Sequence, residues 1–340
     1  MIVDPLDEYP IRDYPRNAIR LDLNESPIPP PREVLEEMAR ELERVNRYPE
    51  ARLILEARRA LAEYSGVDPG MVALTGGGDY GILTLLALFK GRWGRIIVPA
   101  YTYSMTPHLA RALGMKVSTV PMVEGEWWGI DEDRLFKEAR IGGAIFIDSP
   151  NNPTGSRLLP ARRLVELAEE ARGPVVVDEA YYDFEGDSIA GYTESHPNLI
   201  SLRTLSKAFS LAGMRVGYII AEESVTRTLR AVAPFPVSRP GLAAVKVLAS
   251  NPGHVRGLVG MVKAERERLK AAMRGLGLRV YNSRTNFLLV DTPLERPYKV
   301  LEEMGVYVKR VPIRETMMRA TVGAPRDNDA LLSALAKVLS

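Results

Sequence analysis

Residues 174–181 read Pro-Val-Val-Val-Asp-Glu-Ala-Tyr, which places an acid at the end of a short apolar strand. Three consecutive valines are apolar on both faces, which is typical of a strand buried inside a parallel sheet. Ligands of open α/β sheets bind beyond the carboxyl ends of such strands. The stretch therefore indicates that Asp178 stands at a ligand-binding edge, although an acid there can also cap a helix or hold Mg²⁺.

Similar short apolar runs recur on both sides of this strand, at 95–98, 116–120, 144–147, 199–202 and 216–220. Helical patterns separate most of them, at 80–89, 104–113, 131–139 and 160–171. Strands that are apolar on both faces and alternate with helices indicate a mostly parallel sheet covered on both sides. We therefore expect an α/β fold.

The pattern of helical and strand segments changes after Pro236. A long polar helical pattern covers 255–275, strand patterns follow at 286–290, 306–308 and 319–322, and a last helix is expected over 327–339. At the other end, four prolines between residues 27 and 31 exclude a helix before about Arg32. We expect an arm with part of a small domain (1–40), a large domain (41–235) and a small α+β domain (236–340).

Composition excludes several classes of function. The chain has no cysteine, and its three histidines are scattered, so we expect no disulfide, no thiolate chemistry and no metal site. The formal net charge is only +2, which disfavours nucleic acid or a membrane surface as a partner. Residues 1–10 lack the apolar core of a signal peptide, and the longest apolar run, 82–89, is too short to span a bilayer. We expect a cytoplasmic protein.

A second informative stretch, residues 204–209, reads Thr-Leu-Ser-Lys-Ala-Phe and follows an apolar run. A lysine amine is a useful Schiff-base nucleophile when burial and nearby positive charge lower its pKa. Arg215 can supply that charge and bind a phosphate, to which the hydroxyls of Thr204 and Ser206 can also donate. Lys207 by itself is more simply a surface lysine, and it is this surrounding cluster that favours the functional interpretation.

Three further segments contain side chains or backbone groups that could bind a ligand. Residues 148–155 read Asp-Ser-Pro-Asn-Asn-Pro-Thr-Gly, a turn sequence that offers the amide of Asn152. Residues 75–79 read Thr-Gly-Gly-Gly-Asp and open a helix, where backbone N–H groups favour an anion. Tyr101 follows a strand end and can stack on a bound ring, with Tyr103 as its rival and a packed core tyrosine as the alternative.

In this order and spacing, the segments resemble the fold-type I aminotransferases that depend on pyridoxal 5'-phosphate (PLP), over nearly the whole chain. The resemblance implies a large domain with a mostly parallel sheet of the seven-stranded type between helices, plus a smaller α+β domain. It implies that Lys207 forms a Schiff base with PLP and moves the proton. Asp178 then pairs with the pyridinium nitrogen, and Tyr181 binds the phenolic oxygen of the ring.

The same resemblance implies the remaining contacts to the cofactor. Asn152 is the second partner of the phenolic oxygen, and Tyr101 stacks on the ring. The phosphate is held by Gly78, Asp79, Thr204, Ser206 and Arg215. Tyr48, in Arg-Tyr-Pro-Glu at 47–50, is similar to the tyrosine that reaches a neighbouring subunit's phosphate, which implies a homodimer with shared active sites.

Within this superfamily the chain is most similar to histidinol-phosphate aminotransferases, through Leu-Asn-Glu at 23–25, Arg-Tyr-Pro at 47–49 and Arg-Thr-Leu-Ser-Lys-Ala-Phe at 203–209. That implies a role in histidine biosynthesis, with histidinol phosphate or an amino acid as donor and a 2-oxo acid as acceptor. The expected substrate contacts are Arg319, which grips a carboxylate, and Asn24, Tyr14 and Lys309. Lys309 and Arg310 stand about where that subfamily places an arginine for the substrate's phosphate.

Three alternatives stay open at this point. A threonine-phosphate decarboxylase shares nearly all of these features, and the arm reads Asn-Glu-Ser-Pro rather than the fuller Asn-Glu-Asn-Pro. An aromatic or aspartate-type aminotransferase would also fit. A regulatory protein without turnover is disfavoured because Lys207, Asp178 and Arg319 are all present.

Overall fold

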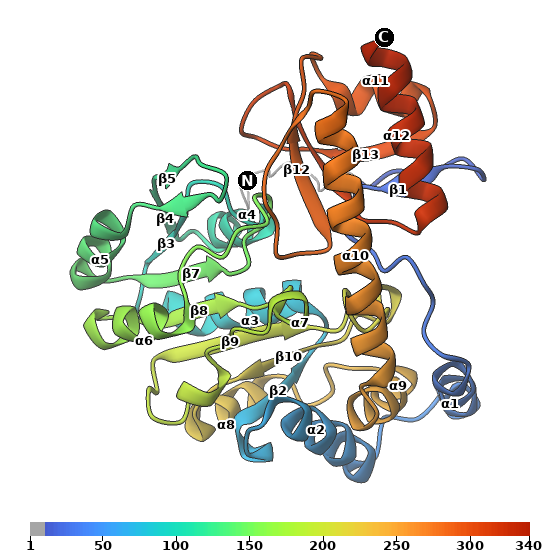
Figure 1. The fold of residues 1–340 in the computed structure, drawn as a ribbon. Helices are drawn as coiled ribbons and strands as arrows, with labels where there is room; N and C mark the ends of the chain where they lie inside the picture. The colour runs from blue at the N-terminus through green and yellow to red at the C-terminus, as the bar shows by residue number, and fades with distance from the viewer. Residues whose placement is uncertain (1–10) are drawn as a thin grey trace, which may run out of the picture.

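The computed structural model describes residues 11–340, so part of the predicted arm, residues 1–10, lies outside the described residues. Two main sheets organise this part of the chain, and Figure 1 shows the larger one below and the smaller one at the upper right. The larger sheet has the strand order β2-β10-β9-β8-β7-β3-β4. Its strands are β2 (Val72–Thr75), β3 (Arg95–Pro99), β4 (Lys116–Val120), β7 (Ala144–Asp148), β8 (Val175–Asp178), β9 (Leu199–Thr204) and β10 (Gly217–Ile220).

This larger sheet is mostly parallel, as the sequence predicts. β4, β3, β7, β8 and β9 run parallel to one another, and only β10 is antiparallel to its two neighbours, β9 and β2. β2 and helix α8 (Glu223–Val232) have no counterpart among the predicted elements. The fold class expected from the alternating pattern is confirmed.

Helices cover both faces of the sheet, and the alternation of side chains along β7 shows how. Ile145 and Ile147 pack toward α5 (Glu132–Ile141) and α6 (Ala161–Glu170), whereas Ala144 and Phe146 pack toward α3 (Gly78–Lys90) and α4 (Met105–Ala112). Successive side chains of a strand point to opposite faces, so a run that is apolar throughout needs cover on both.

The smaller sheet has the order β1-β13-β14-β12-β11. Its strands are β1 (Ile19–Leu21), β11 (Arg279–Val280), β12 (Phe287–Asp291), β13 (Val306–Arg310) and β14 (Met317–Thr321). α11 (Pro297–Glu303) and α12 (Pro325–Leu339) pack with it. β1 comes from the arm, where no strand is predicted, and it pairs in parallel with β13. The arm therefore joins the edge of a sheet formed by the far end of the chain.

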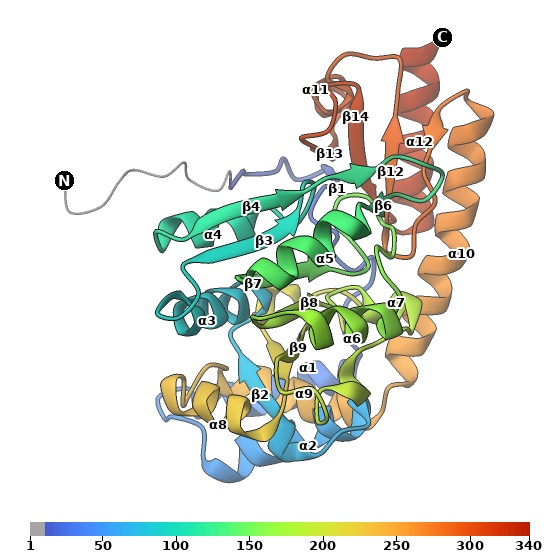
Figure 2. The ribbon, with the colours of Figure 1, turned by 90° about the vertical axis from the view of Figure 1, so that its left-hand side faces the viewer.

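One long helix, α10 (Gly253–Gly275), links the two regions and runs beside both of them in Figures 1 and 2. Val255 and Val262 in its first half belong to the core of the larger region, and Leu269 and Met273 belong to the core under the smaller sheet. The first half packs with α2 (Ala51–Ser65) and α9 (Arg239–Ser250), and α1 (Arg32–Leu42) packs on α9. The predicted division of the chain at residues 40 and 235 stays a prediction.

Among the helices within residues 11–340, none combines the length and apolar character required to cross a bilayer. The same residues contain no group of three or more histidine, cysteine, aspartate or glutamate side chains arranged to hold a metal ion.

Candidate active site

A cavity of about 650 Å³ lies where the carboxyl ends of β7, β8 and β9 face β13 and β14 of the smaller sheet. Asn24 enters it from the arm, Asp178 and Lys207 from the larger region, and Lys309 and Arg319 from the smaller one. The other predicted residues that line it are Gly78, Asp79, Asn152, Tyr181, Thr204, Ser206 and Arg215. Tertiary structure thus brings most of the predicted site into one cavity, at the sheet edge where α/β proteins bind ligands.

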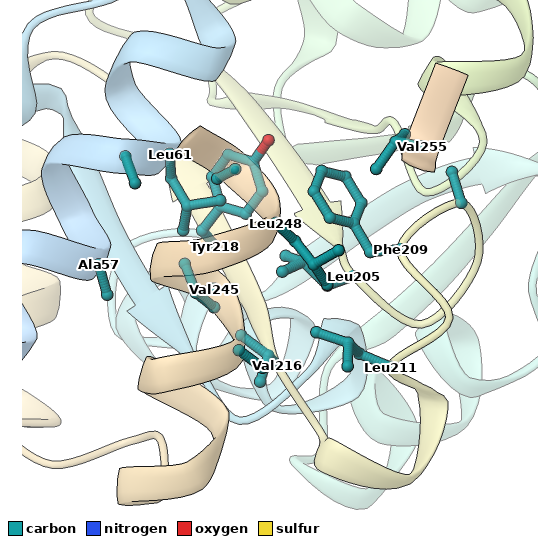
Figure 3. Close-up of a cluster of buried hydrophobic side chains, with 14 of the residues drawn as sticks. Ala57, Leu61, Leu205, Phe209, Leu211, Val216, Tyr218, Val245, Leu248 and Val255 are labelled. Atoms are coloured by element: carbon teal, nitrogen blue, oxygen red, sulfur yellow. The ribbon is translucent and has the colours of Figure 1, made fainter. Parts of the chain in front are cut away.

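Lys207 lies in a loop that is anchored on both sides by buried apolar residues. Leu205 and Phe209, which flank the lysine, and Leu211 insert into a core formed with α2 and α9, as Figure 3 shows. The Nζ atom of Lys207 turns toward the cavity and donates a hydrogen bond to the Leu23 carbonyl at 2.9 Å. Packing of the neighbours therefore holds the amine in place while leaving its own side chain available for chemistry.

The electrostatic setting of Lys207 suits a nucleophile. Burial lowers the pKa of Lys207 to about 8, and the positive charges of Arg319 and Arg215 contribute in the same direction. Removing a lysine from water disfavours its charged form, so a sizeable fraction of this amine is neutral near pH 8. A neutral amine is the form that attacks a carbonyl or accepts a proton.

Asp178 ends β8 and lies half-buried in the wall of the cavity. Its Oδ1 atom accepts a hydrogen bond from the Ala180 N–H at 3.0 Å. Burial raises the pKa of Asp178 to about 7, and the charge of the neighbouring Asp148 adds to the rise. A half-buried carboxylate with this little hydrogen bonding is costly by itself, and a cationic group on a ligand would stabilise it.

Tyr181 and Arg319 are held by partners from distant parts of the chain. Asn24 Nδ2 donates to the Tyr181 hydroxyl at 2.8 Å. Arg319 Nη1 donates to Asn152 Oδ1 at 2.6 Å, and Nη2 donates to the Asp22 carbonyl at 2.5 Å. The arm, the larger region and the smaller region therefore meet at this point, so a shift of any one of them would disturb the site.

The glycine-rich segment forms a cradle at the N-terminus of α3. Gly77 has φ +88° and ψ 176°, a conformation that is almost restricted to glycine. A Cβ atom added there would lie 2.8 Å from Arg215 Nη2. Arg215 in turn donates to Asp79 Oδ2 at 3.0 Å, and the Thr204 hydroxyl donates to Ser206 Oγ at 2.9 Å. Helix N–H groups, hydroxyls and a guanidinium thus converge as a phosphate site requires.

Replacing Gly77 by alanine should destabilise this cradle. The backbone conformation of Gly77 costs a non-glycine residue about 1–3 kcal/mol, so we expect Gly77→Ala to lower the melting temperature and weaken phosphate binding. Thermal unfolding with and without inorganic phosphate checks both effects. Gly91→Ala is the control, because nothing lies within 4 Å of a Cβ atom at Gly91 and its φ is −64°. Equal melting temperatures and an equal effect of phosphate in the two variants would contradict the assignment of this segment as a phosphate cradle.

Three predicted tyrosines lie outside the cavity lining. Tyr101 packs edge-on against Trp128, with ring centroids 5.7 Å apart. It is Tyr103 that lines the cavity, with its hydroxyl donating to Asp79 Oδ1 at 2.9 Å. Tyr14 donates to Asp22 Oδ2 at 2.8 Å. Tyr48 is 78% exposed and stacks on Phe235 with a centroid distance of 4.9 Å.

Sequence reasoning assigned no role to two groups at this site. The Leu23 carbonyl is a backbone atom, and its contact with Lys207 depends on where the arm crosses the cavity. Asp148 lies opposite Asp178 in the register of β7 and β8 and also lines the cavity. The sequence did contain a pattern that could have identified Asp148. Asp148 and Asp178 each follow an apolar run, and the carboxyl ends of the two runs meet at the same edge of the sheet.

Comparison with known proteins identifies the family. The family model described as aminotransferase class I and II matches residues 16–337. The chain belongs to this family. A histidinol-phosphate aminotransferase from Sulfurisphaera tokodaii is 37% identical over 337 residues, covering 98% of this chain and 93% of that protein. One from Thermococcus kodakarensis is 40% identical over 321 residues, covering 93% and 91%.

Solved structures agree with this aminotransferase fold. The crystal structure of histidinol-phosphate aminotransferase from Sinorhizobium meliloti, in complex with pyridoxal-5'-phosphate, has a TM-score of 0.86. It is 24% identical to this aminotransferase, and the alignment covers 95% of this chain and 90% of that one. At that identity the likeness concerns the fold alone. The predicted fold type and the prediction that the chain is a transaminase are both confirmed.

Proposed function

We propose that this aminotransferase uses PLP, held by Lys207, to move the amino group of histidinol phosphate to a 2-oxo acid. The names of the relatives that are 37% and 40% identical support the substrate. The observation that carries the proposal is the pairing of two cations on adjacent strands of the cavity wall, Lys309 on β13 and Arg319 on β14.

The residues of the cavity fit PLP. The half-buried Asp178, with its raised pKa, suits a protonated ring nitrogen, and Lys207 suits the aldehyde carbon. Tyr181 and Asn152 would hold the phenolic oxygen, and Tyr103, in place of Tyr101, would lie against the ring. The phosphate would be held by Gly78, Asp79, Thr204, Ser206 and Arg215. When bound, PLP supplies an electron-withdrawing ring that stabilises negative charge on the substrate carbon.

The chain's own residues perform the proton transfer. Lys207 Nζ, with its pKa lowered to about 8, takes the proton from the substrate carbon and returns it at a neighbouring position. Arg319 orients the substrate through its anionic group, and this orientation selects which bond is broken. Asn152 fixes Arg319 through the 2.6 Å hydrogen bond, so the group that positions the substrate is coupled to the group that would hold the ring.

The Lys309–Arg319 pair favours a strongly anionic substrate. The two residues are register partners in an antiparallel ladder, so their side chains lie on the same face, with Cβ atoms about 5 Å apart. An anion placed between the two side chains would contact both positive charges through charge-assisted hydrogen bonds. A phosphate, with a charge near −2 and three acceptor oxygens, matches two adjacent cations better than a single carboxylate does.

We also propose a homodimer with shared active sites. Its support is an exposed aromatic pair outside the cavity, Tyr48 at 78% exposure stacked on Phe235 at 51%. Other large apolar side chains on the surface include Leu42, Val45, Tyr80 and Val232. Aromatic side chains are enriched at protein–protein interfaces. The cytoplasmic location stays a prediction.

The substrate proposal is tested with PLP-loaded protein, histidinol phosphate and 2-oxoglutarate. We expect formation of glutamate and a keto phosphate ester, and a kcat/KM about 100-fold lower for histidinol, because charge-assisted hydrogen bonds to the phosphate are lost. Coupled detection of glutamate measures the rate. Equal rates with histidinol, or faster turnover of aromatic amino acids or aspartate, would refute the assignment. Release of carbon dioxide from threonine phosphate would identify a decarboxylase instead.

A further inference from the structure

A second buried acid, Asp148, lies beside Asp178. Asp148 ends β7 as Asp178 ends β8, and the two are register partners in neighbouring parallel strands about 4.8 Å apart. Both line the cavity, and Asp148 is 5% exposed. Since burying two like charges side by side is costly, each of them needs a physical reason to be there.

The hydrogen bonds of Asp148 distinguish it from Asp178. Its Oδ1 accepts from the Thr102 hydroxyl at 2.8 Å and from Asn151 Nδ2 at 3.0 Å. Its Oδ2 accepts from the backbone N–H groups of Tyr103 at 3.2 Å and Asn152 at 2.8 Å. A carboxylate has about four lone-pair sites, so these donors occupy all of them. Asp178, by contrast, accepts only the Ala180 N–H among residues 11–340, which leaves it open to a ligand.

The four donors belong to the two loops that flank the cavity. Thr102 and Tyr103 follow β3, and Asn151 and Asn152 follow β7, so Asp148 joins the two loops at a single carboxylate. Tyr103 and Asn152 both line the cavity, and Asn152 also holds Arg319. Asn151 Nδ2 also donates to the Tyr101 carbonyl at 2.9 Å, so the two loops meet around this shared buried acceptor, which helps to fix their relative position.

We propose that Asp148 is a positioning residue that sets Tyr103 and Asn152 at the distance required to enclose the cofactor ring. It acts through these residues and not by direct contact, because its acceptor sites are already filled. The inference rests on the proposed binding of PLP. Asparagine would not replace it, since one carbonyl oxygen cannot accept from four donors and the new NH₂ group would face two of them.

The test measures PLP affinity and the visible circular dichroism of the bound cofactor for Asp148→Asn and Asp148→Glu. We expect the dissociation constant to rise about 10- to 100-fold in both, the range found for groups that orient a ligand's contacts, and the dichroism band to shrink. The glutamate variant keeps the charge but displaces the oxygens. Normal affinity in Asp148→Glu would show that charge alone matters and would overturn the positioning role.

Glu138→Gln is the matched control. Glu138 on α5 is also 5% exposed, but it pairs with Arg95 of β3 and Arg134 of α5, and none of the three lines the cavity. We expect this variant to lose thermal stability and to keep its PLP affinity within twofold. If the two Asp148 variants also lose thermal stability but keep their PLP affinity within twofold, the proposal is wrong.

Thr102→Val provides a test in case the Asp148 variants do not fold. It removes one donor from Oδ1 and leaves the acid in place, so we expect a smaller loss of PLP affinity, about three- to tenfold. Unchanged affinity and dichroism in a folded Thr102→Val protein would also overturn the proposal. Failure of the unmodified protein to bind PLP would refute the proposed function, whereas normal binding by every variant would refute only the role of Asp148.

Discussion

Lys207→Ala is expected to abolish the visible absorbance of a lysine–PLP Schiff base and to lower kcat for amino transfer by about 10⁴-fold. Lys207 carries the one amine of the loop between Leu205 and Phe209, and this amine turns into the cavity, where it can transfer a proton. Absorbance spectra and single-turnover kinetics with PLP-loaded protein measure the two effects.

Lys337→Ala is the control for this experiment, because Lys337 is exposed on α12. We expect its spectrum and rate to match the unmodified protein.

A further check uses pH. Because the pKa of Lys207 is lowered to about 8, the neutral amine becomes the major form above that pH. The rate at which PLP reacts with cofactor-free protein should therefore rise with pH and level off above about 8. Persistence of the absorbance band in Lys207→Ala would overturn the assignment of the lysine.

Arg319→Lys is expected to reduce kcat/KM for glutamate and for histidinol phosphate by about 100-fold or more. The guanidinium binds Asn152 with Nη1 and the Asp22 carbonyl with Nη2, while its face lies over Phe287 at 5.2 Å. An ammonium group keeps the charge but cannot reproduce this planar geometry, and each charge-assisted hydrogen bond that is lost costs about 1.5–3 kcal/mol. Steady-state kinetics with both substrates measure the loss.

Arg314→Lys is the matched control for this variant. Arg314 lies on the segment before β14 and pairs with Glu124 and Asp291, which do not line the cavity. A lysine there keeps the charge, so we expect kinetics within about threefold of the unmodified protein. Near-normal kinetics in Arg319→Lys would show that the anionic group of the substrate is bound elsewhere.

Much of the larger sheet could be predicted because its signal is local. β3, β4, β7, β8, β9 and β10 begin and end within two residues of the predicted runs, since each is a short apolar stretch between polar turns. β1 was missed because three residues in a proline-rich arm carry no such pattern. It forms a strand only because β13, almost 290 residues further on, offers a free edge.

The site residues divide in the same way. Asp178 and Lys207 could be predicted because each stands directly after an apolar strand or inside a distinctive short segment. The choice between Tyr101 and Tyr103 could not be predicted, because the two tyrosines lie only two residues apart after the end of β3 and share the same local pattern. Trp128, from a different part of the chain, packs against Tyr101 and leaves Tyr103 to line the cavity.

Local sequence patterns were therefore sufficient to predict six of the seven strands of the larger sheet, the strand-end acid Asp178 and the lysine segment, because hydrophobic periodicity and turn chemistry act over a few neighbouring residues. Three relations became visible only in the folded chain: Lys309 lies opposite Arg319, the Leu23 carbonyl meets Lys207, and the acceptor sites of Asp148 are filled while Asp178 stays open. Those relations depend on strand register and on the path of the arm. Both are set by packing between segments that lie far apart in the chain, and no local pattern encodes them.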